Sequence, residues 1–347
     1  MSAPIDAVGA AGPATAADVL LDVSDLTVEF STRHGAIAVV EHVDLQIARG
    51  QVHAVVGESG SGKSVTALAI MGLLPRRTAR IASGRILFRD RDLTRLSSRE
   101  LRDIQGRELA MVFQEPMTSL NPAFKVGDQI AESVRHHLGK SRKEARARAV
   151  ELLDEVGIPQ ASRRLDSYPH EFSGGMRQRV MIAMALACNP VLLIADEPTT
   201  ALDVTIQAQI VDLLRRLSRD HGTAVMFITH DFGVVAEVAD VVTVMYAAQA
   251  IESADVFGLF EEPRHPYTEA LLHAVPSLDD EIVVDDERGL PGVPPNPTAF
   301  PRGCRFAPRC SYATDRCRAA PVELEAVRPD RLVRCVRAGE LTLGGRS

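Results

Sequence analysis

Residues Gly57 to Ser64, with the sequence GESGSGKS, have the types and spacing of a loop that binds the phosphate groups of a nucleotide. Glycines let such a loop curl so that its N–H groups point inward, and the helix that follows adds partial positive charge there. Lys63 would reach the β- and γ-phosphates of ATP, and the Ser64 hydroxyl would bind Mg²⁺. The predicted nucleotide-binding residues of this segment are Gly57, Ser59, Gly60, Ser61, Gly62, Lys63, Ser64 and Val65.

The residues on either side of this loop favour the same interpretation. Residues 52–56 (VHAVV) have the composition of a buried strand, and residues 65–71 (VTALAIM) have that of a helix. A phosphate-binding loop functions only between a strand and a helix, so this context favours it over the alternative of a simple glycine-rich turn.

Two carboxylates follow another apolar run, at residues 192–195. This placement predicts that Asp196 lies near the Mg²⁺ and that Glu197 lies beside the γ-phosphate, where it polarises the attacking water. The alternative is an acidic cap on a following helix. Pro198 directly follows these carboxylates and a phosphate-binding loop is present in the same chain, so we favour a role in ATP hydrolysis over that of a helix cap.

A third segment, residues 173–179 (SGGMRQR), predicts a helix start that offers a second set of N–H donors to phosphate. The segment resembles the signature motif of ABC transporter ATPases. The resemblance implies that Gln114 is the Q-loop glutamine and a Mg²⁺ ligand, and that His230 is the switch histidine. It also places Asp203 in the D-loop (residues 201–203) and Phe30 against the adenine, although a core phenylalanine is the alternative for Phe30.

The resemblance further implies that two ATPase subunits meet head to tail. Ser173, Gly174 and Gly175 of one protomer would close over ATP bound to the other, and the partner would be a second copy or a paralogue. Two membrane permease subunits would complete the transporter, and the run after Gln114, from residue 119 to 124, would face them. The alternative is a soluble ABC ATPase outside transport, which more often carries two such domains or a long coiled coil.

Three further segments resemble the ATPase subunits of dipeptide and oligopeptide importers. They are residues 113–122 (FQEPMTSLNP), 263–272 (PRHPYTEALL) and 303–310 (GCRFAPRC). The resemblance covers residues 20–337 and implies peptide cargo delivered by a separate binding protein, with nickel or glutathione as alternatives. It places the chain peripherally on the cytoplasmic face of the cell membrane. Phe172 and Ala248 depart from the usual leucine and glycine, away from the phosphate chemistry.

Four of the five cysteines lie near the C-terminus as C-x5-C-x6-C-x17-C, whereas Cys188 is expected in the core. Clustered thiols in a cytosolic protein suggest a metal site more than disulfides. Iron–sulfur, zinc and unligated cysteines all remain open on spacing alone. The importer resemblance favours one structural 4Fe-4S cluster on Cys304, Cys310, Cys317 and Cys335. Nearby arginines would offset its negative charge, namely Arg302, Arg305, Arg309, Arg316 and Arg334.

The elements that must position these residues indicate an α/β protein. Alternating residues at 26–30 and 43–47 predict antiparallel strands. Buried strands are predicted at 110–113, 191–195, 224–228 and 241–245, with a helix at 204–217 that ends at Gly222. Between residues 115 and 188 helices replace strands, and Ser141 with Glu144 forms a capping box.

This pattern predicts the fold class: a P-loop ABC ATPase core with an antiparallel β-subdomain, an inserted helical subdomain and a small Cys-rich C-terminal extension. The expected divisions are a disordered segment 1–17, a nucleotide-binding domain 18–275, and a linker with a C-terminal domain 276–347. A net charge of −7 over 347 residues gives no reason to expect nucleic-acid binding. The apolar run 180–195 is broken at Asn189-Pro190, so no transmembrane segment is expected.

Overall fold

The computed structural model describes residues 18–33, 35–115, 119–200, 203–274, 290 and 292–346. Several predictions fall outside these ranges: the N-terminal segment 1–17, residues 116–118 after the Q-loop, Ala201 and Leu202 of the D-loop, and residues 276–289 and 291 of the linker. Among the described residues, no helix has both the length and the apolar character needed to cross a membrane.

The core of the molecule is an eight-stranded sheet in the order β11-β12-β10-β9-β3-β8-β7-β6. The five strands from β9 to β6 run parallel, and the other three are antiparallel additions. Parallel strands are covered on both faces, which explains their continuous apolar runs. The strands are β3 (Val52–Val56), β6 (Leu109–Val112), β7 (Leu192–Asp196), β8 (Ala224–Thr229), β9 (Val241–Tyr246), β10 (Gln249–Asp255), β11 (Glu325–Arg328) and β12 (Arg331–Val333).

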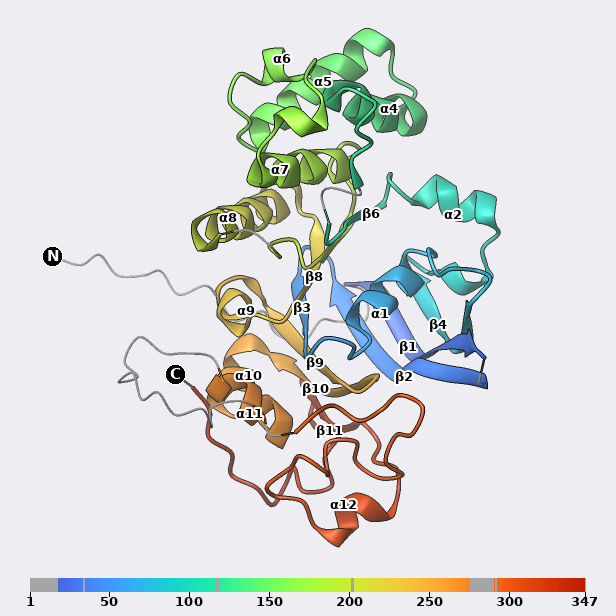
Figure 1. Ribbon diagram of the computed structural model, residues 1–347, viewed down its shortest axis with the longest axis vertical. Helices are drawn as coiled ribbons and strands as arrows, with labels where there is room; N and C mark the ends of the chain where they lie inside the picture. Colours follow the sequence, from blue (N-terminus) through green and yellow to red (C-terminus); the bar gives the residue numbers. More distant parts are fainter. Residues whose placement is uncertain are drawn as a thin grey trace, which may run out of the picture.

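A second, antiparallel sheet has the order β2-β1-β4-β5 and lies beside α1 (Figure 1). Its strands are β1 (Val19–Thr32), β2 (Gly35–Ala48), β4 (Ala79–Phe88) and β5 (Arg91–Asp92), followed by η1 (Leu93–Arg95) and α2 (Ser98–Ile104). Leu26, Val28, Val43 and Ile47 are fully buried in one cluster with α1 (Lys63–Ile70), so the predicted antiparallel strands are confirmed.

A group of helices lies at the top of the molecule in Figure 1, away from the C-terminal segment. They are α4 (Val126–Leu138), α5 (Arg142–Glu155), α6 (Ala161–Arg164), η2 (Pro169–Glu171) and α7 (Gly174–Ala185). The capping box of Ser141 and Glu144 is present at the start of α5 as predicted, because each residue bonds the backbone N–H of the other. Cys188 is buried as expected, but it lies in the turn after α7.

Four more helices follow β7 in the chain: α8 (Val204–His221), α9 (Phe232–Val238), α10 (Val256–Glu261) and α11 (Pro266–Ala274). Gly222 ends α8 in the left-handed conformation, with φ 63°, as the sequence predicts.

The C-terminal segment from residue 292 packs directly on the ATPase sheet. Strand β12 pairs with β10, so Val333 lies opposite Glu252, and the short helix α12 (Asp315–Ala319) lies farther out (Figure 1). Four arginines of the segment are buried: Arg305, Arg309, Arg331 and Arg334. Three of them form ion pairs with carboxylates of the ATPase domain, of which only Glu252 is fully buried, and Arg334 donates to backbone carbonyls, those of Ala250, Val322 and His42. Buried arginines therefore attach this segment, which has few apolar residues of its own.

The pair between Arg331 and Glu252 is the most deeply buried of these anchors, at 2.6 Å. Glu252 also accepts the backbone N–H groups of Arg264 and His265, at 2.7 and 3.0 Å. Glu252→Gln should lower the free energy of unfolding by ~3 kcal/mol, because it leaves a buried guanidinium without its counter-charge. Glu340→Gln, which removes an exposed partner of Arg316, should lower the free energy of unfolding far less, because water screens that pair. Denaturant unfolding measures both variants, and equal midpoints would contradict the prediction.

Candidate functional site

The loop 57–62 joins β3 to α1 in the conformation that a phosphate-binding loop needs. Gly57 and Gly62 have φ angles of 148° and 104°, which favour glycine. A Cβ on Gly57 would lie 2.0 Å from the carbonyl oxygen of Met245, and one on Gly62 would lie 2.7 Å from that of Val39. The backbone thus approaches its neighbours too closely for any other residue at these two positions.

Lys63 closes this loop from inside. Its Nζ donates to the carbonyl oxygens of Gly57 and Glu58, at 2.7 and 3.0 Å, and the side chain is buried. Burial lowers the pKa of Lys63, and the nearby charges of Glu197, Asp196 and Glu58 oppose that shift. Ser61 Oγ is also buried, and it has no hydrogen-bond partner within the described part of the chain. A buried ammonium and an unpaired hydroxyl in one glycine loop fit a phosphate group.

Ser64 and Asp196 supply oxygen ligands beside the loop. The Ser64 hydroxyl donates to Asp196 Oδ1 at 2.9 Å, across the gap between α1 and the end of β7. Burial is the main reason that the pKa of Asp196 is raised, and the bond from Ser64 opposes it. A hydroxyl and a carboxylate in contact are suitable ligands for Mg²⁺, which prefers oxygen. The residues present therefore fit the metal that the sequence predicts.

Glu197 is the centre of a hydrogen-bonded group at the same edge of the sheet. Its Oε2 accepts from Gln114 Nε2 at 2.9 Å and from the Thr200 hydroxyl at 2.8 Å. His230 Nδ1 lies 3.6 Å from Oε1 of the same carboxylate. The structure thus brings together Gln114, Glu197 and His230, which are far apart in the chain. Sequence reasoning missed Thr200, although a hydroxyl three residues after the carboxylate was a usable signal.

Glu197 itself has an unusual backbone, with φ 44° directly after β7. Its N–H donates to the carbonyl oxygen of Ile228 on the neighbouring strand at 2.9 Å. This bond fixes the turn so that the carboxylate leaves the strand toward Gln114. A non-glycine residue held at positive φ is a feature often found at functional sites.

The segment 173–175 begins α7 but does not join this group. Ser173 accepts the N–H of Met176 at 3.4 Å, and a Cβ on Gly175 would lie 2.7 Å from Ile206 Cγ2 of α8. No hydrogen bond between the described residues of this segment and the phosphate loop is found. Asp203 caps α8 by accepting from Ile206 N at 3.0 Å. Phe30 is half-buried against the β-subdomain core, so its contact with adenine stays a prediction.

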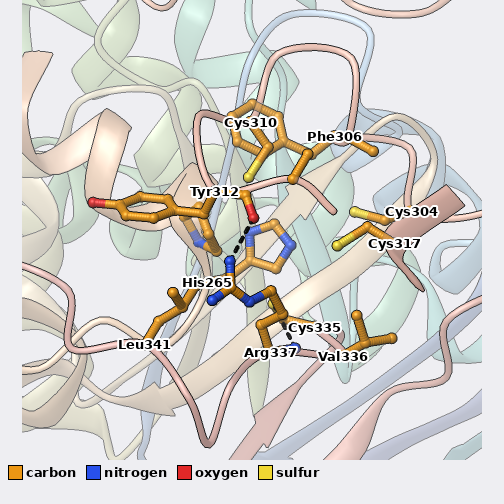
Figure 2. A pocket seen from close by; sticks show the side chains of 13 residues that line it. His265, Cys304, Phe306, Cys310, Tyr312, Cys317, Cys335, Val336, Arg337 and Leu341 are labelled. Atoms are coloured by element: carbon orange, nitrogen blue, oxygen red, sulfur yellow. Dashed lines mark hydrogen bonds between the residues drawn. The ribbon is translucent and has the colours of Figure 1, made fainter. Parts of the chain in front are cut away.

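The C-terminal cysteines do not form the predicted metal site. Cys304, Cys310, Cys317 and Cys335 line one cavity of about 20 Å³, which holds about one water molecule and is too small for an iron–sulfur cluster. Figure 2 shows Cys304 and Cys317 on one side of this cavity and Cys310 across it. No group of three metal-ligating side chains suited to an ion exists within the described ranges.

Burial is the main influence on the thiols of this cavity: it raises the pKa of Cys304 and Cys310, and it raises that of Cys335 to about 11. Four of the five arginines expected to offset a cluster have other partners: Arg305, Arg309 and Arg316 pair with carboxylates, and Arg334 donates to backbone carbonyls. The prediction of a 4Fe-4S cluster, with zinc as its alternative, is therefore wrong.

The strand order, the phosphate loop and the carboxylates after β7 define an ATPase of the ATP-binding cassette class. Residues 40–200 match the family model "ABC transporter", and residues 251–317 match "Oligopeptide/dipeptide transporter, C-terminal region". The chain belongs to the ATP-binding subunits of the dipeptide and oligopeptide ABC importers, which confirms the resemblance found in its sequence.

Two relatives and one solved structure illustrate this membership. The oligopeptide transport ATP-binding protein AppD of Bacillus subtilis is 51% identical, covering 91% of this chain and 96% of its own. The dipeptide transport ATP-binding protein DppD of Escherichia coli K12 is 50% identical, with the same coverage. The ATP-binding cassette MJ0796, solved as a dimer in a post-hydrolysis state with ADP and Pi, is 27% identical, with a TM-score of 0.62. That match covers 68% of this chain and 98% of MJ0796.

Gly57→Ala tests the close approach of the loop to β9. The added methyl group would meet the Met245 carbonyl oxygen, so the loop must move, and both the thermal midpoint and ATP affinity should fall. Gly60→Ala is the matched control, because its φ is also positive, at 78°, but no heavy atom lies within 4 Å. The control should lose only ~1–2 kcal/mol from backbone strain. Equal thermal midpoints for the two variants, measured without nucleotide, would contradict this account.

Proposed function

We propose that this chain is the ATP-hydrolysing subunit that powers import of di- or oligopeptides through an ABC transporter. The observation that carries the proposal is the convergence of Lys63, the Ser64–Asp196 pair and Glu197 at one edge of the sheet. The relatives named above are oligopeptide and dipeptide transport proteins, which supports peptides over nickel, glutathione or a role outside transport.

In this proposal the loop holds the phosphates and a few side chains hold the metal. Lys63 leaves the carbonyls of Gly57 and Glu58 for the β- and γ-phosphates, while the N–H groups of the loop and Val65 surround them. Ser64, Asp196 and Gln114 would hold Mg²⁺, which when bound would offset the negative charge of the phosphate groups. Phe30 contacts the adenine.

Glu197 acts as the base for the attacking water. Its carboxylate is already held by Gln114 and Thr200, so it needs little rearrangement to orient a water molecule toward the γ-phosphate. His230, 3.6 Å away, stabilises charge that develops on the γ-phosphate. Catalysis of phosphoryl transfer rests mostly on such positioning and electrostatic stabilisation.

The active unit is a head-to-tail pair of ATPase subunits, either two copies or this chain with a paralogue. Ser173, Gly174 and Gly175 at the start of α7 complete the site of the partner, which explains why they make no bond to their own loop. Val204, beside Asp203, is 83% exposed and supplies apolar surface for that contact. The dimeric form of MJ0796 supports this assembly.

Glu197→Gln should abolish turnover while ATP still binds, because the amide cannot accept the proton of the water but leaves the phosphate contacts intact. We expect hydrolysis to fall by about 10²–10⁴-fold and a closed, ATP-bound dimer to accumulate. Lys63→Ala should instead weaken ATP binding itself. Phosphate release and size-exclusion chromatography with ATP measure these effects. Near-normal hydrolysis by Glu197→Gln would remove Glu197 from the role of base.

The surface that meets the permease subunits is a groove of about 310 Å³ between the sheet and α7. Its lining is apolar and adaptable, with methionines from three elements. The residues are Met71, Leu73, Gln105, Gly106, Ala110, Met111, Phe113, Ser119, Ser133, Met181, Met184 and Ala185. Leu73 and Phe113 are exposed, and the groove begins next to Gln114, so movement at the γ-phosphate has a short path to it. Leu120, expected to be exposed, is buried, whereas Phe124 is 57% exposed.

Docking on this groove places the chain on the cytoplasmic face of the membrane, with peptide delivered from the other side by a binding protein. Nucleic acid has no part in this function. We also infer three parts of the chain: a nucleotide-binding domain at residues 18–275, a helical subdomain within it at about 115–188, and a C-terminal part from 276 to 347.

Cysteines introduced at Ser119 and Phe124 should crosslink to a cytoplasmic loop of a permease subunit. Val327→Cys is the matched control, because Val327 is also exposed but lies on β11, in the C-terminal segment. The crosslinks are detected by gel shift and mass spectrometry of the assembled transporter. Their absence in an active complex, or equal crosslinking from Val327→Cys, would contradict the proposed docking groove.

A further inference from the structure

The C-terminal segment makes a direct contact with the phosphate-binding loop. The Arg309 guanidinium donates two hydrogen bonds to the Glu58 carboxylate, at 2.7 and 3.0 Å. The Arg309 side chain is 4% exposed and that of Glu58 is 26% exposed, so water screens this bidentate pair only partly. The two residues lie 251 positions apart in the chain.

Aromatic side chains hold both partners of this pair in place. The Tyr267 hydroxyl accepts the backbone N–H of Glu58 at 3.0 Å, and the Tyr246 hydroxyl accepts from Arg309 at 3.2 Å. The two tyrosine rings lie 4.5 Å apart, and the Phe306 ring packs edge-on against both, at 5.3 Å. Strand β9, helix α11 and the C-terminal segment thus meet at Glu58.

Glu58 is linked in turn to the lysine that binds phosphate. Its carbonyl oxygen accepts from Lys63 Nζ, and its carboxylate charge acts on the same ammonium. The phosphate-binding motif accepts any residue at this position, so phosphate binding alone does not require a glutamate. A carboxylate beside bound ATP would repel the phosphates unless a positive charge balances it.

We propose that Arg309 is a positioning residue for ATP binding, which holds the phosphate loop through Glu58 and neutralises the charge of that carboxylate. The C-terminal segment then acts on the nucleotide site of its own chain. This inference rests on the proposed function, because it concerns the loop that would bind ATP.

The test compares single and double variants of the full-length chain. Arg309→Gln leaves the Glu58 carboxylate unpaired, so the Kd for a fluorescent ATP analogue should rise by about tenfold. A change of this size is typical when one of two contacting charged groups is removed. Glu58→Gln in the Arg309→Gln background removes the unpaired carboxylate and should recover most of that affinity. In the assembled transporter, Arg309→Gln should raise KM for ATP while kcat stays within about twofold, because Gln114, Glu197 and His230 are untouched.

Arg331→Gln is the matched control. It breaks the buried ion pair between Arg331 and Glu252 of β10, which also attaches the C-terminal segment but does not contact the phosphate loop. It should lower the thermal midpoint but leave ATP affinity within about twofold of the wild type. Wild-type affinity in Arg309→Gln, equal weakening in Arg331→Gln, or no recovery in the double variant would each overturn the inference. Failure of the wild type itself to bind ATP would instead overturn the proposed function, and the inference with it.

Discussion

Parallel pairing of four neighbouring strands is the constraint on which the site depends. In the ladder, Val56 lies opposite Thr229, Asp196 opposite Ile228, and Val112 opposite Ala195. The carboxyl ends of β3, β8, β7 and β6 therefore share one edge of the sheet, and the residues that follow them must meet there. The phosphate loop, the two carboxylates, the glutamine and the histidine each occupy one of these positions.

Burial at this edge sets the electrostatics of the site. Desolvation lowers the pKa of Lys63 and raises that of Asp196, because it disfavours the charged form of each group. Charges in such surroundings act more strongly on each other than charges in water. Metal and phosphate binding would replace the interactions that these two side chains now make with Ser64 and the loop carbonyls. Lys63 and Asp196 are thus already positioned in the site and partly shielded from water.

The parts of the site that follow directly from a strand could be predicted from the sequence, because local pattern fixes them. The loop at 57–64 and the carboxylates at 196–197 belong to this group, and outside the site the capping box at 141–144 was predicted in the same way. Predictions that depend on distant contacts were weaker. Leu120 is buried because the chain turns back toward the helices. Thr200, by contrast, lies only three residues after Glu197 and was simply missed.

The C-terminal segment shows the same limit more sharply. Clustered cysteines and basic residues suggested a metal cluster balanced by arginines, yet the partners of Arg305 and Arg309 are Glu41 and Glu58, more than 200 positions earlier. Sequence spacing cannot reveal such pairings. The burial of the cysteines is a consequence of these anchors and of the packing around Phe306, so the thiols are covered without serving as ligands.

The pairing of β12 with β10 also has a consequence for behaviour in solution. A sheet that ended at β10 would present a row of unpaired backbone groups, which invites strand-by-strand association between chains. Instead β12 pairs with the middle of β10, at Glu252 and Ser253, and the last strand, β11, has only four residues, all exposed, with charged side chains at Glu325 and Arg328. A short, charged edge strand is a poor template for pairing with a strand of another chain, so the C-terminal segment disfavours aggregation through this edge of the sheet.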